Sequence, residues 1–214
     1  MTGLIAVRTD DAVHVVTDAA TTDLANGALM LIGRKQIITR NGVAIAGTGL
    51  AIPYRRFARL AEKRARNFDE VAEIAAEMWK EGLAEVSAVA YASMRPELKS
   101  VVCNLIFAGW SEQHKCLAID VMKPAGEHML DATAVAVGPP GGDSTDFVKS
   151  FIQRFVDDPN SFDPHRDGVE FMQTLRHDYP QQIRARDPRC CRRIYPAHGR
   201  HTRPHRDEDH PSLA

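Results

Sequence analysis

The sequence predicts an α+β fold in which two antiparallel sheets lie face to face and helix pairs cover both outer sides. Three observations support this expectation. The expected elements occur in the order strands, two helices, strands, two helices, which differs from the strict alternation of a doubly wound parallel sheet. Short β-rich runs are bounded by turn residues. The longer segments between them carry apolar residues at helical spacing.

Strand signals fill the beginning of the chain. Residues 3–9 and 13–18 are β-rich runs on either side of an Asp-Asp turn, which predicts a hairpin. Three further strand pieces are expected at 29–32, 36–39 and 43–46, with an Arg-Asn-Gly turn between the last two. The glycines in 47–49 are expected to break the last of these strands.

Two helices are expected next. Pro53 fits the first turn of a helix running to about Arg66, because the missing proline N–H has no intrahelical partner at that position. Asn67 and Glu70 are three residues apart and resemble a capping box, which predicts the start of a second helix.

The later elements repeat this order. Strands are expected over 101–110, 116–121 and 129–137, with Cys103 and Cys116 as buried core thiols. A third helix should begin near Ser144, and a fourth at Asp163-Pro164, where an N-cap residue precedes a proline.

Composition excludes several classes of protein. The chain has 214 residues, of which 44% are apolar and 26% charged, and its formal net charge is −1. These values are typical of a globular domain and favour neither a nucleic-acid partner nor an anionic membrane. The four cysteines form no CxxC pair, and the sequence contains no apolar run of about 20 residues and no signal peptide. A cytoplasmic location without membrane contact is therefore expected.

The C-terminal part has a different composition. Residues 184–214 contain eight arginines, four histidines and four prolines but few aliphatic residues, so they cannot bury a core. We therefore expect a domain over 1–180 and a disordered tail over 181–214. Back-translated in a shifted frame, residues 191–198 can encode an apolar, strand-like segment, which raises the hypothesis of a frameshift between Arg176 and Cys191.

Other interpretations of the tail are weaker. Its histidines and cysteines match no common zinc spacing, so no metal site is expected; they are Cys190, Cys191, His198, His201, His205 and His210. Its arginines lie beside the acidic run 207–209 and have no aromatic platform, which disfavours nucleic-acid binding.

Standard phosphate and hydrolase motifs do not occur. The sequence has no GxxxxGK[ST], no GxGxxG after a strand, no HExxH and no GxSxG. The glycine-rich turn at 138–142 precedes a helix, but its two prolines donate no N–H, so a plain turn is favoured over a phosphate cradle.

The beginning of the chain carries the most informative chemistry. Removal of Met1 would leave Thr2 with a hydroxyl and a free α-amine, whose unperturbed pKa of about 7.7 to 8.0 suits a general base. Asp18 ends the strand that pairs with the first one, and the Lys35 ammonium could favour a deprotonated hydroxyl. Gly47 could offer its N–H to an oxyanion. Each feature also has a purely structural alternative: Thr2 could belong to a frayed terminus, Asp18 and Lys35 could form an ordinary surface ion pair, and Gly47 could be a simple turn glycine.

Together these residues resemble the proteasome β-subunit family, and most closely its bacterial HslV-type branch. The matching stretches are Thr2-Gly3-Leu4-Ile5-Ala6-Val7-Arg8, Val15-Val16-Thr17-Asp18, Lys35 and Ile45-Ala46-Gly47-Thr48-Gly49. The resemblance continues as far as Gly142, about two thirds of the chain. It implies an N-terminal-nucleophile fold, which is a four-layer αββα sandwich whose last strand pair would be incomplete here.

The implied activity is that of a threonine-type peptidase. Thr2 would attack the scissile carbonyl with its own amine as base, Asp18 and Lys35 would tune it, and the Gly47 N–H would stabilise the oxyanion. The resemblance also implies substrate-binding positions near Thr21, Ile37, Thr48 and Ala51. The implied partners are a peptide or unfolded protein substrate, further copies of the chain in a ring and an ATP-dependent unfoldase. It implies no metal or organic cofactor.

Two positions depart from the family pattern. The family has a serine in the turn before the third helix, where this chain has the run at 138–142 with Ser144 displaced, and many subunits have an arginine where Ala19-Ala20 stands here. Two other hypotheses therefore stay open, a catalytically inactive ring or scaffold protein and a small-molecule amidase of the same fold.

Overall fold

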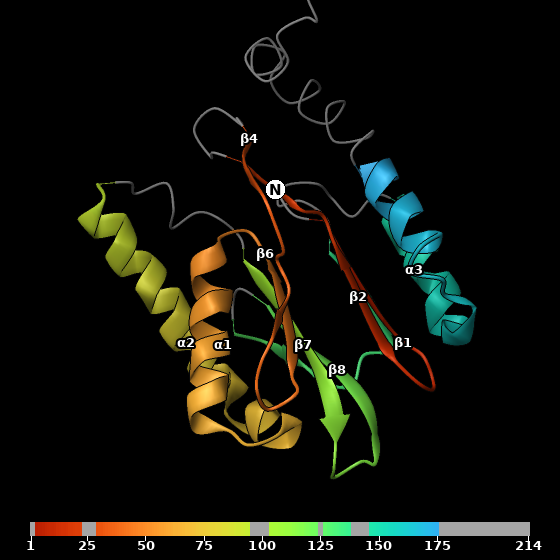
Figure 1. Cartoon of the computed structure of the whole chain (residues 1–214), viewed down its shortest axis with the longest axis horizontal. Helices are drawn as coiled ribbons and strands as arrows, with labels where there is room; N and C mark the ends of the chain where they lie inside the picture. The colour runs from red at the N-terminus through yellow and green to blue at the C-terminus, as the bar shows by residue number, and fades with distance from the viewer. Residues whose placement is uncertain (1–2, 23–28, 95–102, 124–125, 138–145, 176–214) are drawn as a thin grey trace, which may run out of the picture.

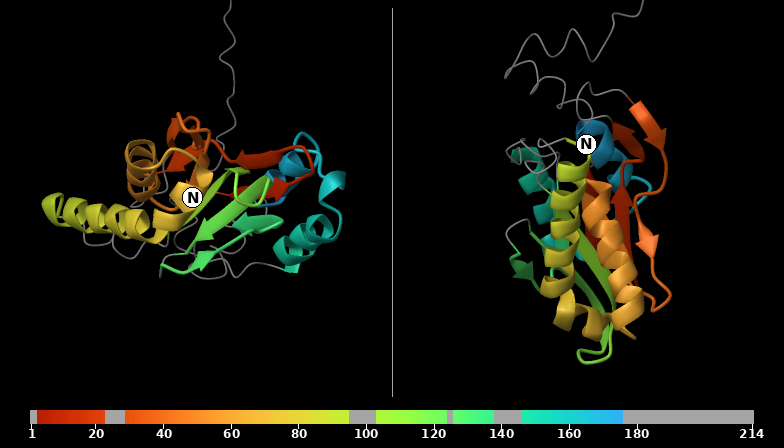
Figure 2. Two further views of the ribbon diagram at one scale, coloured as in Figure 1. Left: turned by 90° about the horizontal axis from the view of Figure 1, so that it is seen from below. Right: turned by 90° about the vertical axis from the view of Figure 1, so that its left-hand side faces the viewer.

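The computed structural model describes residues 3–22, 29–94, 103–123, 126–137 and 146–175. These residues form a mixed α/β fold with two main antiparallel sheets and helices, as the sequence predicts. Figure 1 and the left view of Figure 2 show two helices on one side of the strands and the remaining helices on the other.

The smaller main sheet has the order β10-β1-β2 and contains the predicted N-terminal hairpin. Its strands are β1 (Leu4–Arg8), β2 (Val13–Thr17) and β10 (Ala134–Val137). The larger main sheet has the order β5-β6-β7-β8-β9. Its strands are β5 (Ile37–Ile38), β6 (Ala44–Thr48), β7 (Asn104–Ser111), β8 (Cys116–Met122) and β9 (His128–Met129).

A separate two-stranded sheet pairs β3 (Ala20–Thr22) with β4 (Leu29–Ile32). The sequence signals identified β4 but missed β3. Three residues are too short a run for the alternation that predicts a strand.

The helices that follow β6 are α1 (Ala51–Arg64) and α2 (Phe68–Ala92). The capping prediction for α2 is confirmed, because the Asn67 side chain accepts a hydrogen bond of 3.0 Å from the Glu70 N–H. The prediction that Pro53 lies in the first turn of α1 is confirmed, because the helix begins at Ala51. Within the described residues, no helix is long and apolar enough to span a membrane.

The remaining helices are α3 (Asp146–Asp157), the short 3₁₀ helix η2 (Pro159–Ser161) and a helical segment over 167–175. The Asp163 Oδ1 accepts hydrogen bonds of 2.8 Å and 3.2 Å from the N–H groups of His165 and Arg166, as an N-cap does, but these residues form a turn and the helical segment begins at 167, later than the sequence predicts.

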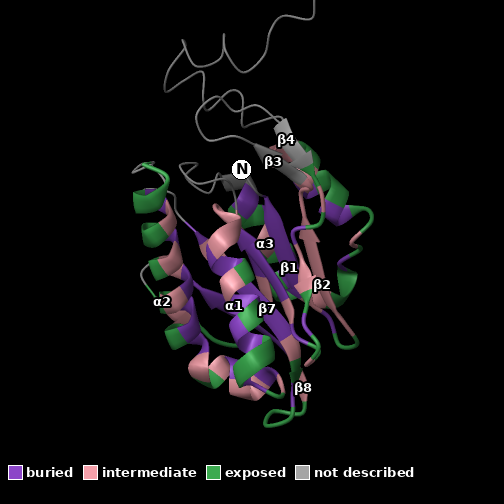
Figure 3. Ribbon diagram, turned by 60° about the vertical axis from the view of Figure 1, so that its left-hand side comes forward, coloured by how far each residue is buried: buried purple, intermediate pink, exposed green. Residues whose placement is uncertain are grey.

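Three groups of buried side chains connect these elements, and the ribbon in Figure 3 marks most of β1 and β7 as buried. One group lies between α1, α2 and the larger sheet and includes Phe57, Trp79 and Phe107. The second joins the two sheets and includes Leu4, Ile106, Ile119 and Val135. The third lies between β1 and the α3 side and includes Ile5, Val7, Phe151, Phe155 and Phe171. Alternate residues of β1 therefore contribute to two different cores.

Two strand predictions were wrong. The expected strand over 129–137 is divided between β9 and β10, which belong to different sheets. Asp131 lies between them with a left-handed φ of 51°, and its N–H donates to Asp120 Oδ1 at 3.0 Å. Gly47 and Thr48 do not break β6, since they pair with Leu105 and Asn104 of β7; the strand ends at Thr48, and the next residue, Gly49, has a φ of +80°.

Several expectations fall outside the described residues. They concern Met1, Thr2, the turn at 138–142, Ser144, the possible frameshift and the whole tail over 181–214. The domain boundary near residue 180 therefore stays a prediction.

Candidate active site

Asp18 lies where the hairpin of β1 and β2 opens. The register Leu4↔Thr17 continues to the next pair, so the Asp18 N–H donates to the Gly3 carbonyl at 3.1 Å. The carboxylate turns back to the same residue, and its Oδ2 accepts the Gly3 N–H at 3.1 Å. The first described residue of the chain is therefore held by the backbone and the side chain of Asp18.

Lys35 forms an ion pair with the other carboxylate oxygen of Asp18. Its Nζ donates to Asp18 Oδ1, and the two side chains are only 8% and 16% exposed. A charge this well buried is stable only with a partner of opposite sign. The sequence prediction that Asp18 and Lys35 lie together is consistent with this contact, and Gly3 joins them.

Gly47 lies on β6, the strand next to β5. The β5–β6 register pairs Ile37 with Ile45 and Ile38 with Ala44. A methyl group on Gly47 would meet the Tyr54 ring, with its Cδ1 only 2.7 Å away. Glycine is thus required at this position for packing. Burial raises the pKa of the Tyr54 hydroxyl.

The four predicted substrate-binding residues lie on β3, β5, β6 and α1. Thr21 is in the middle of β3, and Ile37 and Ala51 are half-buried against the core below α1 and α2. Thr48 is buried, and its Oγ1 accepts hydrogen bonds from the Asn104 N–H at 3.3 Å and from Asn104 Nδ2 at 3.1 Å. The Thr48 side chain therefore ties β6 to β7.

Sequence reasoning missed a hydrogen bond beside the ion pair. Gln36 Nε2 donates to Thr17 Oγ1 at 2.7 Å. Each partner is the chain neighbour of a predicted site residue, Lys35 or Asp18. That adjacency was the only available signal.

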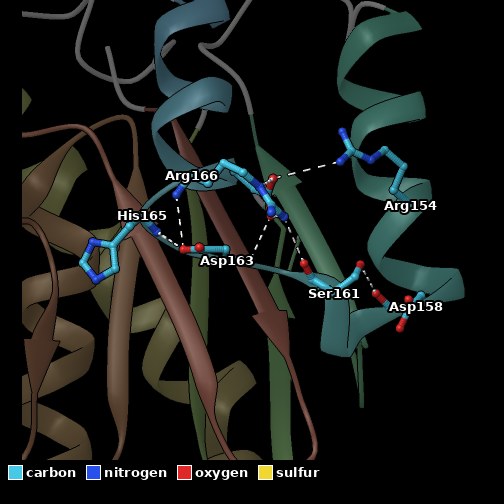
Figure 4. Close-up of polar contacts among 7 residues, drawn as sticks. Arg154, Asp158, Ser161, Asp163, His165 and Arg166 are labelled. Carbon is cyan, nitrogen blue, oxygen red and sulfur yellow. Dashed lines mark hydrogen bonds and ion pairs between the residues drawn. The ribbon is translucent and has the colours of Figure 1, made fainter.

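Sequence reasoning also missed a second cluster of charges, shown in Figure 4. The buried Asp167 carboxylate accepts two hydrogen bonds of 2.9 Å from the Arg166 guanidinium and one of 2.8 Å from the Asp163 N–H, and Arg154 of α3 lies 4.0 Å from it. The Arg166 guanidinium is the main reason why the pKa of Asp167 is held below its ordinary value. This cluster ties α3, η2 and the helical segment over 167–175 together.

The two cysteines predicted as core thiols differ. Cys103 is buried, and the Leu50 N–H donates to its Sγ at 3.4 Å. Burial raises the pKa of this thiol, which keeps it protonated. Cys116 is only half-buried at the start of β8, so the prediction of a fully buried thiol was wrong for this residue.

Sequence comparison gives no relative. No protein-family model matches the chain, and no curated protein sequence matches it.

Comparison with solved structures does find similar chains. Anbu, described as an ancestral beta-subunit, from Yersinia bercovieri is 17% identical, with a TM-score of 0.49 over 71% of this chain and 64% of that one. A Gly-1 mutant of Anbu from Hyphomicrobium sp. strain MC1 is 12% identical, with a TM-score of 0.55 over 89% and 77% of the two chains. Eukaryotic HslV from Trypanosoma brucei is 17% identical, with a TM-score of 0.49 over 81% and 89%.

The likeness to the Hyphomicrobium Anbu mutant shows the fold alone, because the two sequences share so few residues. This chain therefore has a fold similar to that of the Anbu mutant. The chain spans less than two thirds of the length of the Yersinia Anbu chain that it matches.

Proposed function

We propose that this chain is a threonine-type peptidase subunit of a proteasome-like assembly, with Thr2 as nucleophile after removal of Met1. The observation that carries the proposal is the position of Gly3. Its N–H donates to Asp18 at 3.1 Å, and the same carboxylate pairs with Lys35. Thr2 is bonded to that nitrogen, so its hydroxyl and amine belong beside the ion pair.

The proposed reaction uses only groups of this chain and water. The Thr2 hydroxyl gives its proton to the free α-amine and attacks the carbonyl carbon of a peptide bond. The C–N bond then breaks, the leaving amine takes up the proton, and an acyl ester remains on Thr2. Water hydrolyses this ester and releases the second product. The Gly47 N–H is proposed to stabilise the oxyanion in both steps.

Lys35 and Asp18 have different parts in this scheme. The Lys35 ammonium stabilises the alkoxide that develops on Thr2, and it favours a neutral neighbouring amine, which can act as the base. Asp18 holds that ammonium in place through Oδ1 and holds the first strand through Oδ2. The Asp18 carboxylate thus holds both Gly3, at the beginning of the chain, and the Lys35 ammonium.

The wider proposal includes the four-layer αββα sandwich. The three cores support it, because they lie between the α1–α2 pair and one sheet, between the two sheets, and between the other sheet and α3. We also propose, on the family resemblance, a homo-oligomeric ring, a peptide or unfolded protein substrate bound near Thr21, Ile37, Thr48 and Ala51, and an ATP-dependent unfoldase as partner. A cytoplasmic location belongs to the same proposal.

The test is intact-mass spectrometry of the full chain before and after treatment with a peptide epoxyketone, which reacts with an amine and a hydroxyl on one residue. We expect the mass without Met1 and one adduct that maps to Thr2. Thr2→Ala should lose the adduct, while Thr9→Ala, a control for threonine removal in the same hairpin, should retain it. Retained Met1 without an adduct would contradict the proposal and favour an inactive scaffold.

A further inference from the structure

The segment over 33–36 crosses from one sheet to another. β4 ends at Ile32 in the two-stranded sheet, and β5 begins at Ile37 in the five-stranded sheet. The segment between them belongs to no strand, although it carries the buried Lys35. A backbone ladder therefore does not fix the position of this lysine.

Side chains continue the pairing where the backbone ladder ends. Ala20 pairs with Ile32, and the Gly33 N–H donates to the Ala19 carbonyl at 2.9 Å. Next along the two antiparallel segments come the Lys35–Asp18 ion pair and then the Gln36–Thr17 hydrogen bond of 2.7 Å.

The hydrogen bond between Gln36 and Thr17 lies next to the ion pair in both segments. Lys35 and Gln36 are successive residues, as are Asp18 and Thr17, so the two contacts hold consecutive positions of the segment over 33–36 against the end of β2. Loss of the Gln36–Thr17 hydrogen bond would release the position next to Lys35.

We propose that Gln36 and Thr17 are positioning residues that hold the Lys35 ammonium against Asp18 at the candidate active site. This inference rests on the proposed function, because the positioned ammonium matters to the rate only if Thr2 is the nucleophile. A misplacement of about 1 Å can cost about 100-fold in rate. Losing one uncharged hydrogen bond should therefore affect turnover more than it affects folding.

The experiment compares Thr17→Val, Gln36→Met and the double variant with the unchanged full chain. Both substitutions keep the size of the side chain and remove the hydrogen bond. Gln153→Met is the matched control, because Gln153 Nε2 donates to Asp157 Oδ1 at 2.8 Å on the exposed side of α3. On a fluorogenic peptide we expect kcat to fall about 10-fold in each single variant with KM unchanged. The double variant should be no worse than the poorer single variant, and Gln153→Met should behave as the unchanged chain.

A second measurement does not depend on activity. Pulse acetylation followed by peptide mapping reports how accessible Lys35 is relative to Lys63, which is exposed on α1. We expect acetylation of Lys35 to become several-fold faster in both single variants and to stay slow in Gln153→Met. Unchanged acetylation of Lys35, a rise in KM at constant kcat, or additive losses in the double variant would each overturn the inference.

The two proposals fail in different ways. If the chain without substitutions shows no turnover and no Thr2 adduct, the proposed function is contradicted. The acetylation rates of Lys35 then decide whether Gln36 and Thr17 hold this side chain. An active chain whose Gln36→Met variant keeps its kcat contradicts only the positioning role.

Discussion

Asp18 and Asp167 are two well-buried carboxylates paired with basic side chains, yet their surroundings differ. Asp167 receives three hydrogen bonds, from Arg166 and from the N–H of Asp163, which are both within four residues of it. Asp18 receives one N–H from Gly3, fifteen residues away, and the ammonium of Lys35, seventeen residues away. The first network is local and the second joins three separate parts of the chain.

This difference separates a structural charge from one suited to chemistry. The Asp167 network completes the start of a helix and connects it to α3, so its contacts have a purpose within the fold. The Asp18 contacts complete no helix and bring a buried ammonium to the beginning of β1. Identical substitutions at the two aspartates should therefore differ in their effect on the reaction.

The largest expected effect is that of Asp18→Asn on the reaction. The amide cannot pair with the Lys35 ammonium, so the rate of epoxyketone addition to Thr2 should fall about 100- to 1,000-fold in the folded protein. The rate is measured by intact mass at a temperature well below the unfolding midpoint. Unchanged addition in a folded Asp18→Asn variant would show that the ion pair has no part in the chemistry.

Asp167→Asn should lower the stability of the chain and leave the rate of the reaction unchanged. The change removes the charge that accepts from Arg166 and leaves a buried amide, so we expect a loss of about 2 kcal/mol in the free energy of unfolding. Urea unfolding measures this loss, and the rate of epoxyketone addition per folded molecule should equal that of the unchanged chain. An Asp167→Asn variant that is as stable as the unchanged chain but reacts slowly with the epoxyketone would contradict a purely structural role for Asp167.

The stabilisation that the Asp167 carboxylate provides should depend on pH. Because the pKa of Asp167 is lower in the folded chain than its ordinary 3.8, the folded state binds fewer protons, and the stabilisation is complete above that ordinary value. It is lost as the pH falls through the lowered pKa. The unfolding free energies of the unchanged chain and Asp167→Asn should thus converge as the pH falls below about 4 and through the lowered pKa. A constant difference over that range would contradict the cause given for the shift.

Gly3 contacts both Asp18 and the helical segment over 167–175, which contains Asp167. A substitution at Gly3 is expected to have the smallest effect on stability. A methyl group at this position would lie 2.6 Å from Leu175 Cδ1 and 3.1 Å from Met172 Sδ. Both are far ends of flexible side chains, so Gly3→Ala should cost about 1 kcal/mol of stability. Gly3→Ala combined with Leu175→Ala should restore the rate of Thr2 labelling if Gly3→Ala lowers it. A labelling defect that persists in the double variant would show that the helical segment over 167–175 is not its cause.

Much of this arrangement could be predicted because it depends on local signals. The hairpin of β1 and β2, the Asn67 cap of α2 and the Asp163 cap each follow from neighbouring residues. The predicted hairpin also put the beginning of the chain near Asp18, and the contact of Asp18 with Gly3 is consistent with that prediction.

The parts that could not be predicted depend on where the chain changes sheets. The alternation over 129–137 is the same whether one strand or two strands are present, so it did not reveal the crossing at Asp131. Gly47 was expected to break a strand, although the ring of Tyr54 fills the space above it within the sheet. Gln36 and Asp167 carry no motif, and their roles follow only from partners brought together by folding.

The most direct test of the central claim is a crystal structure of the chain treated with a peptide boronate. We expect Met1 to be absent, boron to be bonded to the Thr2 Oγ, and the Lys35 Nζ to lie within hydrogen-bonding distance of that oxygen while it contacts Asp18. A chain that retains Met1 and carries no boronate, with Thr2 directed away from Lys35 and Asp18, would contradict the account.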